Sequence, residues 1–103
     1  MDKEVSDYIK SRNMTPDQII SQVTAICRNL NVEHLSLFGS YAEDNPHDGS
    51  DIDFIVYGVN DIQELKDKID RISTLTKIDI FDYDNCKNEH LRKDMDSYGK
   101  KIY

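Results

Sequence analysis

The sequence has few of the features that mark secreted or membrane-spanning proteins. It contains two cysteines, Cys27 and Cys86, and no apolar stretch that resembles a signal peptide or reaches membrane-spanning length. These absences argue against a disulfide-rich secreted domain and against a transmembrane segment. We therefore expect a cytoplasmic protein with both thiols free, and a Cys27–Cys86 disulfide is the less favoured alternative.

Positive charge is also scarce. The chain has 13 lysines and arginines against 20 aspartates and glutamates, which gives a formal net charge of -7. An acidic surface repels nucleic-acid backbones and anionic membranes, so neither is expected as a partner. A metal-bound nucleotide remains compatible with this charge, because the metal supplies positive charge locally.

The length of 103 residues suffices for one modest core. We expect a single domain over residues 1–103, in which residues 1–14 form an arm or a short helix. The periodicity of the apolar residues predicts an α/β (α+β) fold, with a small mixed sheet flanked by helices. The expected helices cover residues 16–30, 61–74 and 88–98, and the expected strands cover residues 32–38, 51–57 and 77–83.

Local signals support the ends of these elements. Thr15, Pro16 and Gln18 have the pattern of a capping box with proline at the first helical position. We expect residues 40–44 to form one helical turn. We expect the chain after Gly99 to form a tail or a short edge strand.

The connections between the strands predict how the sheet is arranged. The segment between the first two strands is too short for a crossover helix, so these strands should be antiparallel. The second and third strands are joined by a helix and should be parallel through a right-handed crossover. Gly39 and Ser40 then lie beside Asp51 and Asp53, and Asp79 lies level with them at the same edge.

Three clustered carboxylates repel one another unless protons or cations neutralise them. Their hard oxygen atoms suit magnesium or manganese, so we expect Asp51 and Asp53 to be metal ligands. Asp79 would complete a second metal site or accept a proton from an attacking hydroxyl. The backbone after Gly39, together with the Ser40 hydroxyl, would hold phosphates, because a glycine lets phosphate approach the main chain.

Each of these features also has an ordinary explanation when it is taken alone. Asp51 and Asp53 could be solvent-facing strand residues, and Gly39-Ser40 could be only a turn. Tyr41 is either a packing residue or part of the nucleotide site. The combination of the turn, the acid pair and the third acid favours the functional interpretation.

Gly39-Ser40, ten further residues, and then Asp51-Ile52-Asp53 resemble the signature of the minimal nucleotidyltransferases of the DNA polymerase β-like superfamily. Asp79, within Lys-Ile-Asp-Ile, is similar to the third carboxylate of that family. The resemblance implies magnesium-dependent transfer of a nucleoside monophosphate, usually AMP from ATP. Free-standing domains of this size resemble the antitoxin of HEPN–MNT toxin–antitoxin pairs, which implies a tyrosine hydroxyl of a HEPN toxin as the acceptor.

The sequence departs from this family at Glu43-Asp44, where many relatives have Arg-Gly. A basic residue near the triphosphate or the partner is therefore missing at this point. The alternative is a non-catalytic module that retains the fold and masks its partner. Transfer to a small molecule or to an RNA end is a weaker alternative. A homo-oligomer is compatible with the sequence.

Overall fold

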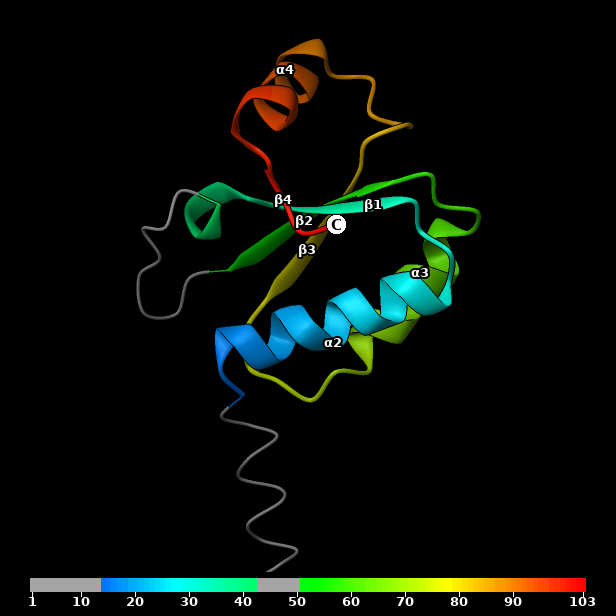
Figure 1. The fold of residues 1–103 in the computed structure, drawn as a ribbon, viewed down its shortest axis with the longest axis vertical. Helices are drawn as coiled ribbons and strands as arrows, with labels where there is room; N and C mark the ends of the chain where they lie inside the picture. The colour runs from blue at the N-terminus through cyan, green and yellow to red at the C-terminus, as the bar shows by residue number, and fades with distance from the viewer. Residues whose placement is uncertain (1–13, 43–50) are drawn as a thin grey trace, which may run out of the picture.

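The computed structural model describes residues 14–42 and 51–103 (Figure 1). The predicted N-terminal arm, apart from Met14, and the segment that contains Glu43 and Asp44 lie outside these residues. The helices are α2 (Pro16–Asn29), α3 (Ile62–Asp70) and α4 (Glu89–Tyr98), and a single 3-10 turn, η1, covers Gly39–Tyr41. The strands are β1 (His34–Phe38), β2 (Ile52–Tyr57), β3 (Ile78–Asp82) and β4 (Lys100–Lys101).

The predicted capping box at the start of α2 is confirmed. The Thr15 hydroxyl accepts a hydrogen bond from the Gln18 backbone at 3.2 Å, and the Gln18 side chain accepts one from the Thr15 backbone at 3.0 Å. Two of the otherwise unpaired N–H groups at the helix start are satisfied in this way. This fixes the first turn of the helix whose buried side carries Ile19, Val23 and Cys27.

The sheet has the predicted mixed arrangement, with strand order β3-β2-β1-β4. Strand β1 runs antiparallel to β2 and to the short β4, and β2 runs parallel to β3. The tail after Gly99 therefore forms the edge strand that the sequence allowed.

Helices α2 and α3 cover one face of the sheet, and α4 lies over the other (Figure 1). The main core forms on the α2–α3 side from the fully buried alternate residues of β2, which are Ile52, Phe54 and Val56. Ile55 points to the opposite face. It is fully buried there, and Met95 of α4 is almost fully buried on the same side. The side chains of β2 alternate between the two faces of the sheet, so its buried residues contribute to both the α2–α3 side and the α4 side.

Two details differ from the sequence prediction. Helix α3 ends at Asp70 rather than at residue 74, and the Thr74 hydroxyl accepts a hydrogen bond from the Thr76 backbone in the turn that follows. Such side-chain bonds compete with helical ones, which is why the pattern over-extended the helix. The helical spacing of Leu91, Met95 and Tyr98 predicts that all three pack on one side of α4, but the Tyr98 side chain is 62% exposed. Among the described residues, no helix is long and apolar enough to cross a membrane.

Candidate functional site

The turn at Gly39 brings the end of β1 against the start of β2. Gly39 has a φ of +67°, which side chains with a Cβ rarely adopt. A Cβ added here would lie 2.6 Å from Oδ2 of Asp53. Glycine is therefore required both by the backbone angle and by the carboxylate that lies against it, and the two parts of the sequence motif meet in space.

The strand register aligns three residues in one row across the sheet. Phe38 pairs with Asp53 across β1 and β2, and Asp53 pairs with Asp79 across β2 and β3. Directly paired residues share a face of the sheet, so both carboxylates lie on the α4 side, away from the main core. The prediction that Asp79 lies level with Asp53 is confirmed.

The pKa of Asp53 is affected by its burial and by the charged side chains around it. Burial raises the pKa to about 6, and the nearby charge of Asp79 and a hydrogen bond between the two carboxyl groups raise it as well. Asp51 adds a weaker repulsion, while Lys77 acts in the opposite direction. Such a pair near neutral pH takes up a proton or a cation readily.

Asp51 differs from this pair in its exposure to solvent. Its side chain is exposed and its charge reaches Asp53, as the pKa effect shows. Within residues 14–42 and 51–103, no group of three or more histidine, cysteine, aspartate or glutamate side chains is arranged to hold a metal ion. The structure therefore brings together Asp53 and Asp79, and the three-ligand set with Asp51 stays a prediction.

The residues nevertheless fit a divalent cation in their chemistry. Carboxylate oxygens are the ligands that magnesium and manganese prefer, and magnesium typically takes one or two of them together with substrate phosphates. Asp53 and Asp79 supply two carboxylates whose mutual repulsion a cation would remove. Because Gly39 has no Cβ, the Asp53 carboxylate can lie directly against the turn.

Ser40 and Tyr41 follow in the 3-10 turn Gly39–Tyr41, and both are half-buried. The Ala42 backbone N–H closes the turn on the Gly39 carbonyl at 3.1 Å. The predicted helical turn is thus present in its first part, while residues 43 and 44 lie outside the described chain. Tyr41 packs against the main core, which agrees with the packing alternative; its contact with a nucleotide stays a prediction.

Lys77 is a site residue that the sequence reasoning missed. Its ammonium lies 3.9 Å from Oδ1 of Asp79, and its side chain is 69% exposed. The Ile52 N–H donates to the Lys77 carbonyl, so Lys77, immediately before β3, lies across from Asp51. In extended backbone, Lys77 and Asp79 are two residues apart and therefore lie on the same face of the sheet. This spacing is the sequence feature that could have identified Lys77 as a site residue.

Other polar residues have structural roles. Oδ2 of Asp84 accepts a hydrogen bond from the Gly58 backbone at 2.6 Å, and Oδ2 of Asp82 accepts one from the Asn85 side chain at 2.7 Å. Asp82 and Asp84 thus act at the end of β3 and in the turn that follows it. Cys27 and Cys86 are both free thiols, as predicted, and burial raises the pKa of Cys27 to about 11.

Comparisons with known proteins agree with this geometry. Residues 21–103 match the family model described as polymerase beta, nucleotidyltransferase. Curated protein sequences gave no match. Two solved structures are similar in fold: a crystal structure of a toxin-antitoxin with AMP-PNP (TM-score 0.60, 22% identity, covering 81% of this chain and 71% of that chain), and a mutant of the toxin-antitoxin MntA-HpeT (TM-score 0.58, 20% identity, with the same two coverages of 81% and 71%). At these identities the two structures establish the fold.

Proposed function

This chain belongs to the polymerase beta nucleotidyltransferase family, and we propose that it transfers a nucleoside monophosphate, AMP from ATP in the first instance, to a hydroxyl group of a partner protein. The observation that supports this most is the meeting of Gly39, Asp53 and Asp79 at one point of the sheet. A phosphate-binding turn and a cation-binding acid pair are the two components that this transfer needs.

In the proposed reaction, the acceptor hydroxyl oxygen forms a bond to the α-phosphorus of the triphosphate. The bond from that phosphorus to the oxygen bridging to the β-phosphate breaks, and pyrophosphate leaves with the electron pair. The hydroxyl proton passes to a carboxylate, for which Asp79 is our candidate. Gly39, Ser40 and Tyr41 would hold the nucleotide on the β1 side of Asp53.

Magnesium or manganese, when bound by Asp53 and Asp79 with Asp51, would neutralise the charge of the phosphates. The chain's own contribution is to hold its carboxylates together despite their repulsion. It does so through the direct register of β2 on β3, which the parallel ladder fixes over five residue pairs.

The partner that we propose is a toxin protein of the HEPN type, modified on a tyrosine hydroxyl, so that the chain acts as its antitoxin. The two similar solved structures are toxin-antitoxin complexes, one of them with AMP-PNP. An acidic chain of net charge -7 fits a protein acceptor better than a nucleic-acid end.

The test is transfer of label from α-labelled ATP, with magnesium, to a protein that co-purifies with this chain. Label on that protein, lost in both Asp51→Asn and Asp53→Asn, supports the proposal. If none of the four nucleoside triphosphates labels the partner, the proposed transfer is wrong.

A non-catalytic module that masks its partner is the second candidate. It is favoured by Glu43-Asp44 in the sequence. This function predicts that Asp53→Asn still neutralises the partner and that ATP with magnesium does not raise the melting temperature. A ligand that binds only the native state must raise it.

A further inference from the structure

Strand β3 forms an open edge of the sheet. It lies beside a hollow that has no role in the transfer reaction proposed above. Within the sheet formed by the described residues, β3 has β2 on one side and no strand on the other. The Ile52 N–H donates to the Lys77 carbonyl, and the Tyr83 N–H donates to the Val56 carbonyl, so odd-numbered residues of this segment bond to β2. The backbone groups of Ile78, Ile80 and Asp82 therefore face outward, where a further strand would pair.

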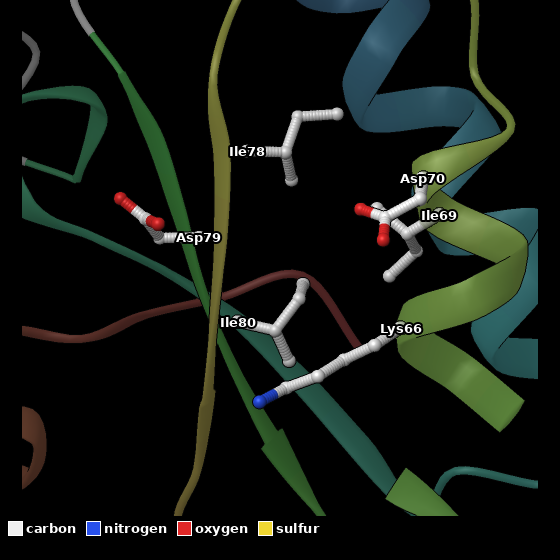
Figure 2. A pocket seen from close by; sticks show the side chains of 6 residues that line it. All are labelled: Lys66, Ile69, Asp70, Ile78, Asp79 and Ile80. Atoms are coloured by element: carbon white, nitrogen blue, oxygen red, sulfur yellow. The ribbon is translucent and has the colours of Figure 1, made fainter. Parts of the chain in front are cut away.

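The hollow of about 230 Å³ lies between α3 and this edge (Figure 2). Ile78 and Ile80 point toward α3, where Ile69 and Asp70 lie, and the Lys66 side chain extends from α3 toward β3. A second hollow of about 360 Å³ shares Ile69, Asp70 and Ile78 and continues toward the loop before β3. Together the two hollows form a strip alongside the free edge in which isoleucine side chains lie among polar and charged ones.

Asp79 connects this edge to the acid pair. It lines the first hollow through β3, and Figure 2 shows its carboxylate on the side of the strand away from the two isoleucines. The Gly39–Tyr41 turn lies on the β1 side of Asp53, whereas Asp79 lies on the β3 side. If the nucleotide occupies the turn, the β3 side of the acid pair is left for the acceptor hydroxyl.

We propose that an extended segment of the acceptor protein adds to the edge of β3 as a further strand, with its hydroxyl-bearing residue opposite Asp79. This inference rests on the proposed transferase function and identifies where the acceptor binds. Neighbouring strands lie about 4.8 Å apart, and paired residues share a face. The side chain opposite Asp79 thus points to the acid pair, and the residues on either side of it point into the hollow.

A second copy of this chain fits the edge less well. Symmetric antiparallel pairing about Ile80 would place Ile78 of each copy opposite the Asp82 carboxylate of the other. Each copy also carries a net charge of -7, which opposes self-association. Recognition by strand addition needs only main-chain pairing and side-chain pockets at alternate positions, and the β3 edge provides both for a partner.

The first test measures amide hydrogen exchange by NMR, residue by residue, with and without the protein that accepts label in the transfer assay. In the free chain the amides of Ile78, Ile80 and Asp82 should exchange much faster than those of Asp79 and Phe81. Acceptor binding should slow the first three by about a hundredfold, because only a bound strand covers them. If their exchange is unchanged while another surface becomes protected, the edge is not the binding site.

The second test fills the hollow. Lys66→Trp places a large ring over it from an exposed helix position, and Lys93→Trp makes the same change at an exposed position of α4. Lys66→Trp should raise the KM for the acceptor about tenfold without changing the KM for ATP, and Lys93→Trp should leave both unchanged.

The outcomes separate the two hypotheses. If wild-type protein transfers label and Lys66→Trp has the wild-type KM for the acceptor, the docking inference is wrong and the transferase function stands. If wild-type protein transfers no label to any partner, both fail together.

Discussion

Asp53 of β2 and Asp79 of β3 are direct partners in a parallel ladder, and their carboxyl groups are close enough to share a proton. A sheet places two acids side by side at a cost, because like charges on paired positions repel. Burial first, and then the charge of Asp79, raise the pKa of Asp53 to about 6. The stability of the fold should therefore depend on pH in part through Asp53.

Asp53→Asn should remove that dependence. The folded-state pKa lies above the ordinary value of 3.8, so the folded protein binds more protons than the unfolded chain between about pH 4 and pH 6. Stability from this group is complete below pH 4 and is lost as the pH rises through 6. At pH 7.5 Asp53→Asn should be more stable than wild type by about 1 kcal/mol, after allowance for solvent screening.

Urea denaturation at pH 4.5 and pH 7.5 checks this. Wild-type protein should lose stability between the two values by more than Asp53→Asn does. An exposed-site control, Asp94→Asn on α4, should keep the wild-type pH dependence. Equal slopes for wild type and Asp53→Asn would mean that the acid pair is not strained in solution.

Gly39→Ala should damage the site more than the fold. The φ of +67° costs about 1 kcal/mol for alanine, and the new Cβ lies 2.6 Å from Oδ2 of Asp53, which must move. A carboxylate can swing aside cheaply, so the main loss is in its position. Binding of manganese, followed by electron paramagnetic resonance, should weaken at least tenfold.

Gly58→Ala is the matched control for this change. Gly58 has the same φ of +67°, at the far end of β2, and its Cβ would meet the side chain of Glu33. Both variants should lose similar stability, but Gly58→Ala should bind manganese as wild type does. Equal weakening in the two variants would indicate a general effect of backbone strain.

Lys77→Met should raise the pKa of Asp53 further. The ammonium 3.9 Å from Asp79 lowers the pKa of Asp53, and methionine keeps the length of the side chain without its charge. NMR titration of the Asp53 side-chain carbon gives the pKa directly. Lys66→Met, which removes a charge from α3 on the other side of β3, should leave it unchanged. A pKa that is the same in Lys77→Met and wild type would exclude Lys77 from the electrostatics of the site.

Much of this site follows from short-range information in the sequence. The ten-residue spacing after Gly39-Ser40 forces antiparallel pairing, and the helix between β2 and β3 forces parallel pairing, so Gly39, Asp53 and Asp79 converge at one edge. The alternation of the β2 side chains between the two faces of the sheet also follows from the two-residue period of a strand. These rules are local or topological and depend little on how side chains pack.

What the sequence could not supply depends on atomic register and on competing local bonds. The 2.6 Å approach of a Gly39 Cβ to Asp53 arises from the pairing of Phe38 with Asp53, and a shift of one residue would turn the carboxylate into the core. The end of α3 depends on a threonine hydroxyl in the next turn. The exposure of Tyr98 depends on how far α4 reaches over the sheet, which helical periodicity does not specify.

Helix α4 is attached to the sheet by little buried apolar surface, and this leads to a last prediction. Met95 is the one buried residue of α4, at 1% exposure, and Ile55 beneath it is fully buried. The remaining contacts are more exposed: Tyr83 donates a hydrogen bond to Asp96 at 2.7 Å, and Arg92 lies 4.8 Å from the Tyr83 ring centroid.

Met95→Ala should cost about 2–3 kcal/mol, near the low end for a buried methionine, because α4 can settle partly into the space. Tyr83→Phe, which removes only the exposed hydrogen bond, should cost less than about 1 kcal/mol. Hydrogen exchange should show α4 opening in Met95→Ala well before α2 does, since α2 carries three buried residues. If α2 and α4 open together, α4 belongs to the same cooperative unit as the main core. The site at Asp53 and Asp79 then cannot open independently of the fold.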